Sequence, residues 1–382
     1  MRDRLTGVAI AGGGVAGMAL AASLRTRGLA ATVLDAGSAR FDRGLCLWGG
    51  ALAALDRGCL GGAVWSLGVP IHRLQLSSAR GRALLDLSSG QAPVFGLSIA
   101  ASSLLRALGE MARFPVRTGR LIGYAEDGDG VLVTFHGGAT AHGQILVGAD
   151  GAFSAVRAQC LDDGPPAHSG DSVWEGISAR TIEPGTIHLY WGPNGVRGGA
   201  MAINERGPAA WWVDAPTGAI GRAEIGPHRP ELQALLAGMA GPLLELIEAT
   251  PEEAIERSDV FARRHAPSAG RGRVTLMGDA AHPLPLSLRM GSTLAIEDAV
   301  ELADALVAEA NPVAALRGYE RRRSPRIEWT GHALWLLRAI EAHGNPAVAW
   351  ARDVWIRHAP ERVAANLLPR VLVGEDLNVA PP

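Results

Sequence analysis

Short apolar runs that predict buried strands alternate along the chain with stretches whose apolar positions recur at helical spacing. Val8–Ala11 and Ala31–Leu34 are such runs, and between them Val15–Arg27 predicts a helix that ends at Gly28. Two further runs, "ILVGAD" from residue 145 and "VTLMGD" from residue 274, each lead into an aspartate. Strands separated by helices in this way predict an α/β fold with a parallel sheet.

The pattern changes between residues 166 and 265, where we expect a second sheet. The segments "TIHLYWG" (186–192) and "GPAAWWVDAP" (207–216) predict two strands of a second sheet. Beyond residue 326 the chain returns to a helical pattern that contains four tryptophans.

Alternation along these two strands places His188 and Tyr190 on one face and separates Trp211 from Trp212. The chain has ten tryptophans and only three tyrosines, which favours a flat, apolar pocket. We expect His188, Tyr190 and Trp211 to line that pocket.

Composition narrows the functional classes. A net charge of −2 argues against a nucleic-acid partner. The sequence contains no lysine, which excludes Schiff-base chemistry. The three cysteines, Cys46, Cys59 and Cys160, lack metal-ligand spacing, so we expect reduced thiols and no metal.

The N-terminal segment imitates a secretory signal, because two arginines precede an uncharged stretch from Gly7 to Leu24. Glycines at 12, 13, 14 and 17 would interrupt the apolar core of such a signal. A nucleotide-binding turn explains these glycines better. We therefore expect a soluble, cytoplasmic protein with no membrane partner.

The spacing Gly12-x-Gly14-x-x-Gly17 fits a dinucleotide-binding turn. Gly12 makes the turn, Gly14 lets the backbone approach a pyrophosphate, and Gly17 lets helix and sheet pack closely. The helix start at Val15 and Ala16 then offers free N–H groups to phosphates. Asp35, at the end of the next strand, is placed to accept hydrogen bonds from ribose hydroxyls.

Three motifs in this order resemble the class A, single-component FAD-dependent monooxygenases, the group of para-hydroxybenzoate hydroxylase. They are "GGGVAG" with Asp35, "GADGAFSAVR" (148–157), and "GDAAHP" (278–283) followed by "EDA" (297–299). The resemblance covers nearly the whole chain. It implies a Rossmann-like FAD-binding domain of discontinuous segments, an inserted β-sheet substrate domain and a C-terminal helical segment.

The domain division that follows from the resemblance alternates between the two units. We assign residues 1–70, 97–165 and 266–325 to FAD binding, 71–96 and 166–265 to the substrate domain, and 326–382 to C-terminal helices.

The resemblance also implies roles for single residues. Asp35 would bind the adenosine ribose, and Asp279 with Gly278 would bind the ribityl or pyrophosphate region. Asp150 and Arg157 would contribute to binding FAD and to the transient binding of NAD(P)H. Arg43 is a candidate for a further arginine beside the flavin.

The loop after the third motif departs from the family pattern. The family's P-x-x-G-Q-G-x-N falls on residues 286–293, where only Gly291 matches and Arg289 and Met290 replace Gly and Gln. We expect Gly291, Ser292 and Thr293 to border FAD, with Ser292 or Thr293 capping the next helix. A second departure puts Ala101 or Ser102 where the family commonly has an arginine that contacts FAD.

Arg289 allows two interpretations. In the first, its guanidinium lies near the reduced flavin or a substrate anion, which makes Arg289 a candidate catalytic residue. Alternatively, it points to solvent from a backbone that tolerates a non-glycine conformation.

The chemistry that the resemblance implies belongs to the flavin: NAD(P)H reduces FAD, O₂ adds at C4a, and the distal oxygen of the hydroperoxide passes to the substrate. We predict a monooxygenase that hydroxylates or epoxidises an aromatic or polycyclic small molecule, for instance in natural-product tailoring, with NADPH or NADH as reductant. We expect a monomer or homodimer. The alternatives are Baeyer–Villiger oxygen insertion, and a flavoprotein or flavin-less scaffold that has lost oxygenation.

Overall fold

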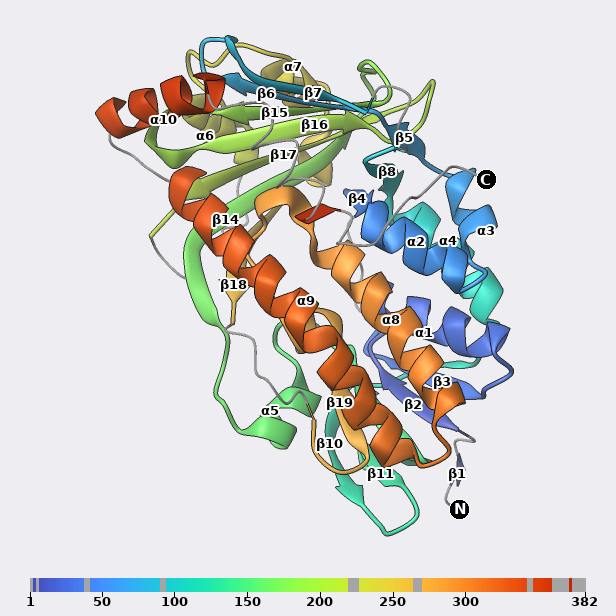
Figure 1. The fold of residues 1–382 in the computed structure, drawn as a ribbon. Helices are drawn as coiled ribbons and strands as arrows, with labels where there is room; N and C mark the ends of the chain where they lie inside the picture. The colour runs from blue at the N-terminus through green and yellow to red at the C-terminus, as the bar shows by residue number, and fades with distance from the viewer. Residues whose placement is uncertain are drawn as a thin grey trace.

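Four β-sheets organise the part of the chain that the computed structural model describes, which is residues 3–4, 7–37, 42–89, 94–218, 227–263, 270–341, 346–358 and 371–372. A parallel sheet lies at the bottom of the view in Figure 1 and a larger sheet at its top. The long helix α9 (Pro312–Glu341) extends from the parallel sheet toward the larger sheet. The two sheets thus belong to different halves of the molecule.

The parallel sheet has the order β19-β13-β2-β3-β9, and all neighbouring strands in it are parallel. Its strands are β2 (Val8–Ala11), β3 (Ala31–Asp35), β9 (Val116–Thr118), β13 (Ile145–Gly148) and β19 (Val274–Leu276). The central strands are apolar throughout because both faces of the sheet are covered. This arrangement confirms the predicted α/β, Rossmann-like fold.

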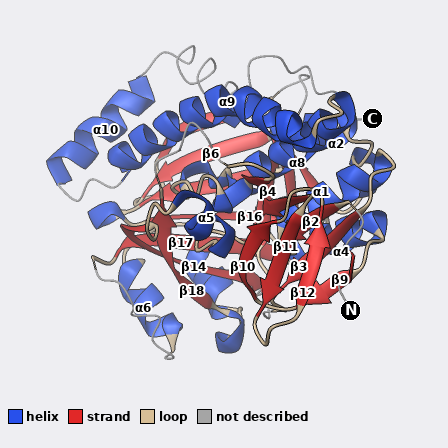
Figure 2. Cartoon of the chain, turned by 90° about the horizontal axis from the view of Figure 1, so that it is seen from below, coloured by secondary structure: helices blue, strands red, loops and turns tan. Residues whose placement is uncertain are grey.

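Helices cover one face of the parallel sheet and a second sheet covers the other. The helices on the first face are α1 (Val15–Thr26), α4 (Ala101–Ala112) and α8 (Gly291–Ala308). The opposite face packs against a four-stranded sheet of β1 (Asp3–Arg4), β12 (Thr140–Gly143), β11 (Val131–Phe135) and β10 (Leu121–Glu126). Helix α5 (Ala155–Leu161) lies beside β10 and follows β13. Figure 2 shows α8 and α9 on the side away from these strands.

The larger sheet has seven strands in the order β18-β14-β17-β16-β15-β6-β7. Their bounds are β6 (Arg73–Ser78), β7 (Ala83–Ser88), β14 (Ala167–Ser178), β15 (Thr186–Trp191), β16 (Arg197–Ala202), β17 (Ala209–Pro216) and β18 (Glu256–Ala262). The strands predicted at 186–192 and 207–216 are therefore β15 and β17. One face packs under α6 (His228–Leu235) and α7 (Leu243–Glu248). The other face turns toward the parallel-sheet half.

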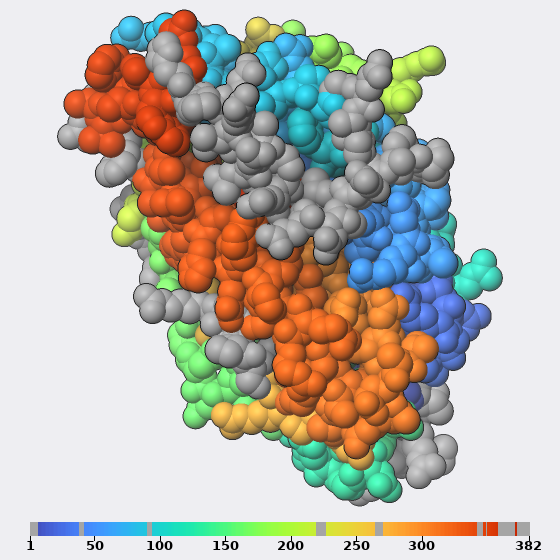
Figure 3. Space-filling model, viewed as in Figure 1, coloured from blue at the N-terminus to red at the C-terminus, as the bar shows by residue number. Residues whose placement is uncertain are grey.

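Smaller elements complete the junction between the halves. A three-stranded sheet, β4-β8-β5, consists of β4 (Gly44–Trp48), β8 (Gly96–Ala100) and β5 (Val69–Ile71), with α2 (Gly49–Arg57) and α3 (Gly61–Trp65) beside it. Single-turn 3₁₀ helices occur at Pro193–Gly195, Glu252–Ala254, Gly278–Ala280 and Ser287–Arg289. Figure 3 shows α9 crossing one face of the molecule.

The C-terminal helices α9 and α10 (Pro346–His358) confirm the helical pattern predicted after residue 326. Trp350 and Trp355 of α10 are largely exposed. Among the described helices, we find none with the length and apolarity needed to cross a membrane.

Candidate active site

The turn between β2 and α1 depends on glycine at two positions. Gly12 has a φ of +108°, and a Cβ there would lie 2.2 Å from the Ala149 carbonyl oxygen. A Cβ on Gly17 would lie 1.9 Å from the carbonyl oxygen of Gly12. Gly14 differs, because nothing lies within 4 Å of its Cβ position. The backbone at Gly14 is thus open to a close approach from outside.

The start of α1 has unsatisfied donors, because no side chain of the described residues caps it. Val15 and Ala16 form its first turn. Asp35 ends β3 beside this turn and accepts a hydrogen bond of 3.2 Å from the Gly13 N–H. A carboxylate and a helix N-terminus therefore lie together at the carboxyl end of the parallel strands, where α/β sheets bind ligands.

The third motif (278–283) lies close to the N-terminal ends of helices α1 and α8. A Cβ on Gly278 would lie 3.0 Å from Cβ of Ala16 in α1 and 3.4 Å from Cβ of Ala295 in α8. The next residue, Asp279, is exposed, and its Oδ1 lies 3.6 Å from the Cβ position of Gly291 at the start of α8. Burial among protein atoms raises the pKa of this carboxyl, although the residue is still exposed to solvent. We infer from the two observations that the carboxyl lies at a concave part of the surface, which we call the recess. Segments far apart in sequence thus converge on Asp279.

Behind this recess lies a buried ion cluster. Asp298 accepts hydrogen bonds from the Gly278 N–H at 2.9 Å and from Arg323 at 2.6 Å, and it contacts Nε2 of His282 at 2.6 Å. Burial raises the pKa of Asp298, but His282 and Arg323 together bring it down to about 2. His282 is itself buried. It therefore positions the turn and is not free to act as a base.

Residues of the second motif (148–157) contact the backbone of the third motif (278–283) and hold it in place. The Asp150 carboxylate accepts hydrogen bonds from the Ser154 hydroxyl at 2.5 Å and from the Ala155 N–H at 2.8 Å, so it caps α5. Burial raises its pKa. Arg157 is 1% exposed and donates to the carbonyls of Ala280 (3.1 Å) and Ala281 (2.5 Å). The structure places this guanidinium under the motif and not at the surface of the recess.

The loop before α8 has an unusual backbone. Leu288 and Arg289 have φ values of +59° and +50°, in the left-handed region that disfavours side chains. Helix α8 begins at Gly291 with Met290 as its N-cap, and no described side chain caps it. The prediction that Ser292 or Thr293 caps this helix is wrong. Thr293 is already inside the helix and fully buried, where its hydroxyl accepts from the Trp48 N–H at 2.9 Å.

The Arg289 side chain lies inside the molecule and not in solvent. Its guanidinium forms an ion pair with Glu175 of β14 and lies 4.8 Å from the centre of the Trp212 ring. Burial lowers its pKa to about 10, so it remains charged at neutral pH. Glu175 also lies 3.7 Å from Arg43, which is exposed. The second interpretation is right about the backbone, which has a conformation that favours glycine, but wrong about the side chain, which does not point to solvent.

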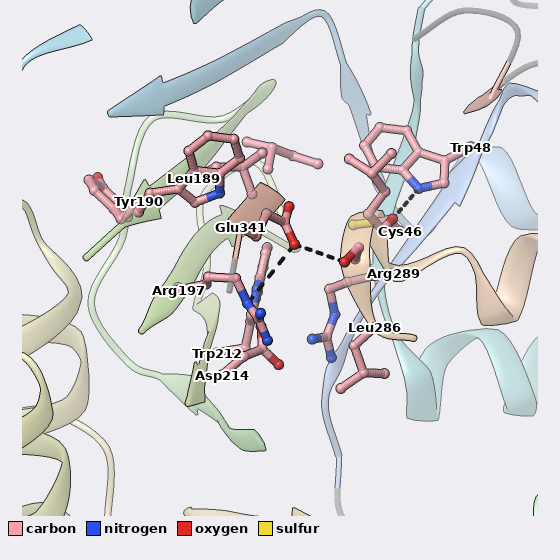
Figure 4. A pocket seen from close by; sticks show the side chains of 15 residues that line it. Cys46, Trp48, Leu189, Tyr190, Arg197, Trp212, Asp214, Leu286, Arg289 and Glu341 are labelled. Carbon is pink, nitrogen blue, oxygen red and sulfur yellow. Dashed lines mark hydrogen bonds and ion pairs between the residues drawn. The ribbon is translucent and has the colours of Figure 1, made fainter. Parts of the chain in front are cut away.

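Arg289 and Trp212 belong to the wall of a cavity between the two halves (Figure 4). Its apolar wall comes from both sides and includes Trp48, Leu189, Trp191, Trp212, Leu286 and Leu288. A polar end is formed by Arg197, Asp214, Ser287 and Glu341. Cys46 also lines the cavity, and burial raises the pKa of its thiol to about 12, which keeps it protonated.

The predicted pocket residues lie mostly on the other face of the seven-stranded sheet. Trp211 donates a hydrogen bond of 2.9 Å to Thr250, while its neighbour Trp212 lines the cavity. Tyr190 borders the cavity, but its ring packs against Gly241 and the cluster under α6 and α7. His188 shares the Tyr190 face and is half-buried, which lowers its pKa. Alternation separated the two faces correctly but did not tell which one meets the cavity.

No sequence motif pointed to Glu175, Arg197, Asp214 or Glu341. A charged residue inside an otherwise apolar strand, as Glu175 is in "SVWEGI", was the available signal. Near the start of α4, the hydroxyl of Ser102 donates to Asp42 at 2.6 Å, so a Ser–Asp pair lies where the sequence resemblance led us to expect an arginine. We find no group of residues arranged to hold a metal within the described ranges.

Comparison with known proteins shows which family carries these three motifs. A family model described as FAD binding domain matches residues 5–330. The chain is 32% identical over 94% of its length to the aurachin C monooxygenase/isomerase of Stigmatella aurantiaca, 95% of which is covered. It is also 32% identical, over 84% of each chain, to the 3-amino-4-hydroxybenzoate 2-monooxygenase PtnB3 of Streptomyces platensis. Its structure is similar to that of Klebsiella pneumoniae HpxO in complex with FAD and uric acid, with a TM-score of 0.85, 25% identity and coverage of 96% and 97% of the two chains.

Proposed function

Because the chain belongs to the FAD binding domain family, and there to the class A FAD-dependent monooxygenases, we propose that it hydroxylates or epoxidises an aromatic or polycyclic small molecule with O₂ and NADPH or NADH. We further propose that it works in the cytoplasm, as a monomer or homodimer.

The observation that carries this proposal is the convergence of Ala16, Gly278–Asp279 and Gly291 beside a mainly apolar cavity. Two uncapped helix starts, α1 and α8, supply N–H donors and the positive ends of their dipoles. The exposed carboxylate of Asp279 and the carboxylate of Asp35 supply acceptors for hydroxyl groups.

These residues fit FAD. The open backbone at Gly14 and the start of α1 would hold the pyrophosphate, Asp35 the adenosine ribose, and Asp279 the ribityl chain. When bound, FAD would take two electrons from NAD(P)H and activate O₂ for transfer of one oxygen atom. Asp150 and Arg157 would act indirectly, by fixing α5 and the turn that carries Asp279.

The residues around the cavity would orient the substrate and exclude water. Flat side chains such as Trp212 and Trp48 suit an aromatic ring system. The start of α8 and the charge of Arg289 would stabilise negative charge at the boundary between the recess and the cavity.

A second candidate function is a flavoprotein that binds FAD but no longer oxygenates. The observation in its favour is the loop itself, because Leu288 and Arg289 hold a strained backbone where the family has a flexible glycine. In that case the Arg289–Glu175 ion pair would only fasten the loop to β14.

One experiment separates the two functions. The purified protein is incubated with FAD and desalted, its absorbance spectrum is recorded, and NAD(P)H oxidation and O₂ consumption are followed with a panel of aromatic compounds. Retained flavin bands with NAD(P)H-dependent O₂ consumption would support the oxygenase. Flavin that is retained but never reduced would support the second function, and a colourless protein would contradict both.

A further inference from the structure

The polar end of the cavity is built from three elements that come together only in the folded chain. Arg197 of β16 and Asp214 of β17 are direct cross-strand partners, so their side chains leave the sheet next to each other. Glu341, at the end of α9, lies above them (Figure 4). Arg197, Asp214 and Glu341 are each at least nine-tenths buried. Charged groups in such a place need partners.

Most of the polar atoms at this end have partners within the protein. Arg197 donates through Nη2 to Asp171 at 3.0 Å, and Arg338 donates to the same carboxylate oxygen at 2.9 Å. Glu341 accepts from the Ser287 hydroxyl at 2.8 Å and lies 4.0 Å from Nε of Arg197. Both arginines are therefore already engaged by carboxylates.

Three buried atoms at this end have no hydrogen-bond partner within the described residues: Oδ1 of Asp171, Oδ1 of Asp214 and Nη1 of Arg197. Of these three residues, Asp214 and Arg197 line the cavity. Buried polar atoms are nearly always satisfied, so an unpaired acceptor beside an unpaired donor in a cavity wall points to a ligand. The complementary group is small and neutral: it donates one hydrogen bond to Asp214 and accepts one from Arg197. An aromatic hydroxyl does both with one oxygen atom.

The charge balance at this end disfavours an anion. Asp214 faces Arg197 from β16, Asp171 from β14 and Glu341 from α9, while Arg338 pairs with Asp171. With all groups ionised, these three carboxylates oppose Arg197 and Arg338, because Arg352, which also lies near Glu341, is paired with Asp353. Burial, with the further effect of Glu341 and Asp171 and against that of Arg197, raises the pKa of Asp214 to about 7. A substrate carboxylate at this end would meet repulsion from Asp214 and Glu341, and the guanidinium that carries the unpaired Nη1 is already paired with Asp171.

We propose that Asp214 and Arg197 form a subsite that selects a neutral aromatic hydroxyl compound over the corresponding aromatic carboxylate. This inference rests on the proposed function, since it names the substrate class of the same cavity. Asp214 accepts the hydrogen bond of the hydroxyl, and Arg197 donates to its oxygen. The guanidinium of Arg289 lies over the Trp212 ring and is paired with Glu175.

Three probes that differ in one substituent test the proposal: 2-naphthol, 2-methoxynaphthalene and 2-naphthoate. Their binding to the FAD-loaded protein is measured by isothermal titration calorimetry without NAD(P)H, so the result does not depend on turnover. The wild type should bind 2-naphthol about tenfold or more tightly than either analogue, because a hydrogen bond to a charged group is worth about 1.5–3 kcal/mol. Binding of 2-naphthoate should strengthen as the pH falls through 7.

The variant Asp214→Asn should lose most of the preference for 2-naphthol and bind 2-naphthoate more tightly than the wild type does. These opposite changes cannot come from misfolding, which would weaken all three probes. Asp86→Asn is the matched control, since this carboxylate lies in the same sheet but pairs with Arg73 at the exposed edge. It should leave all three affinities unchanged.

Equal binding of the three probes by the wild type, tightest binding of 2-naphthoate, no measurable binding of 2-naphthol, or an unchanged preference in Asp214→Asn would overturn the subsite. Reduction of bound FAD by NAD(P)H is assayed separately. An enzyme that is reduced normally but shows no such preference would refute the subsite alone and leave the oxygenase intact.

Discussion

Two turns of this molecule lead into uncapped helix starts, and they reach their conformation by different means. Before α1, the position of Gly12 requires glycine for two reasons: its φ is positive, and the Ala149 carbonyl leaves no room for a Cβ. Before α8, Leu288 and Arg289 have positive φ although they carry side chains. Their contacts hold the second turn: the Leu288 carbonyl accepts from Trp48 at 2.7 Å, and Arg289 pairs with Glu175. The first turn is fixed by backbone sterics and the second by side chains from distant strands.

The largest expected effect tests the sterics of the first turn. Gly17→Ala should lower the free energy of unfolding by about 3 kcal/mol or more, because its Cβ would overlap the Gly12 carbonyl oxygen. Gly14→Ala is the matched control, since its Cβ position is empty. Thermal unfolding and FAD retention are measured for both variants. Equal stability of the two would contradict the steric account.

The second prediction concerns the recess between the two turns. Asp279→Ala should weaken FAD binding about tenfold to a hundredfold while the apoprotein stays as stable as the wild type, because this carboxylate is exposed. Titration with FAD, followed by flavin fluorescence, measures the affinity. Wild-type affinity in this variant would remove Asp279 from the cofactor site.

The third prediction concerns the buried ion cluster behind the recess. The folded-state pKa of Asp298 is depressed to about 2, so its contribution to stability is present above the ordinary pKa near 4 and is lost as the pH falls toward 2. The expected contribution is about 2 kcal/mol. Urea unfolding between pH 5 and 2.5 should show a smaller loss of stability in Asp298→Asn than in the wild type. The same loss in both would assign the acid sensitivity to other carboxylates.

The smallest effect is expected at the second turn. Arg289→Gly should leave FAD bound, because glycine accepts the local φ, but should change the rate of flavin reduction or the coupling of NADPH use to product by less than about tenfold. Leu288→Asn keeps the arginine and also tolerates the left-handed backbone. Stopped-flow reduction and product yield are compared. Identical changes in both variants would mean that the backbone, and not the charge, matters.

The contrast between the two turns also explains what the sequence could predict. The parallel sheet, the glycine turn and the helices follow from local sterics and from apolar spacing, which are readable along a single strand or helix. The contact of Glu175 with Arg289 joins residues 114 positions apart. The choice of Trp212 over Trp211 depends on α6 and α7 covering the other face of the sheet. These features depend on packing between distant segments, which no local pattern encodes.

Helix α9 has a consequence for the geometry of the whole site. Near its start, Arg317 donates to the Val274 carbonyl and Glu320 accepts from Thr275, both in the parallel sheet. At its end, Glu341 borders the cavity. Thirty helical residues span about 45 Å, and each residue rotates the chain by about 100° around the helix axis. The number of residues in α9 therefore sets both the spacing and the angle between its two ends, so that the length of one helix specifies the site as much as any side chain within it.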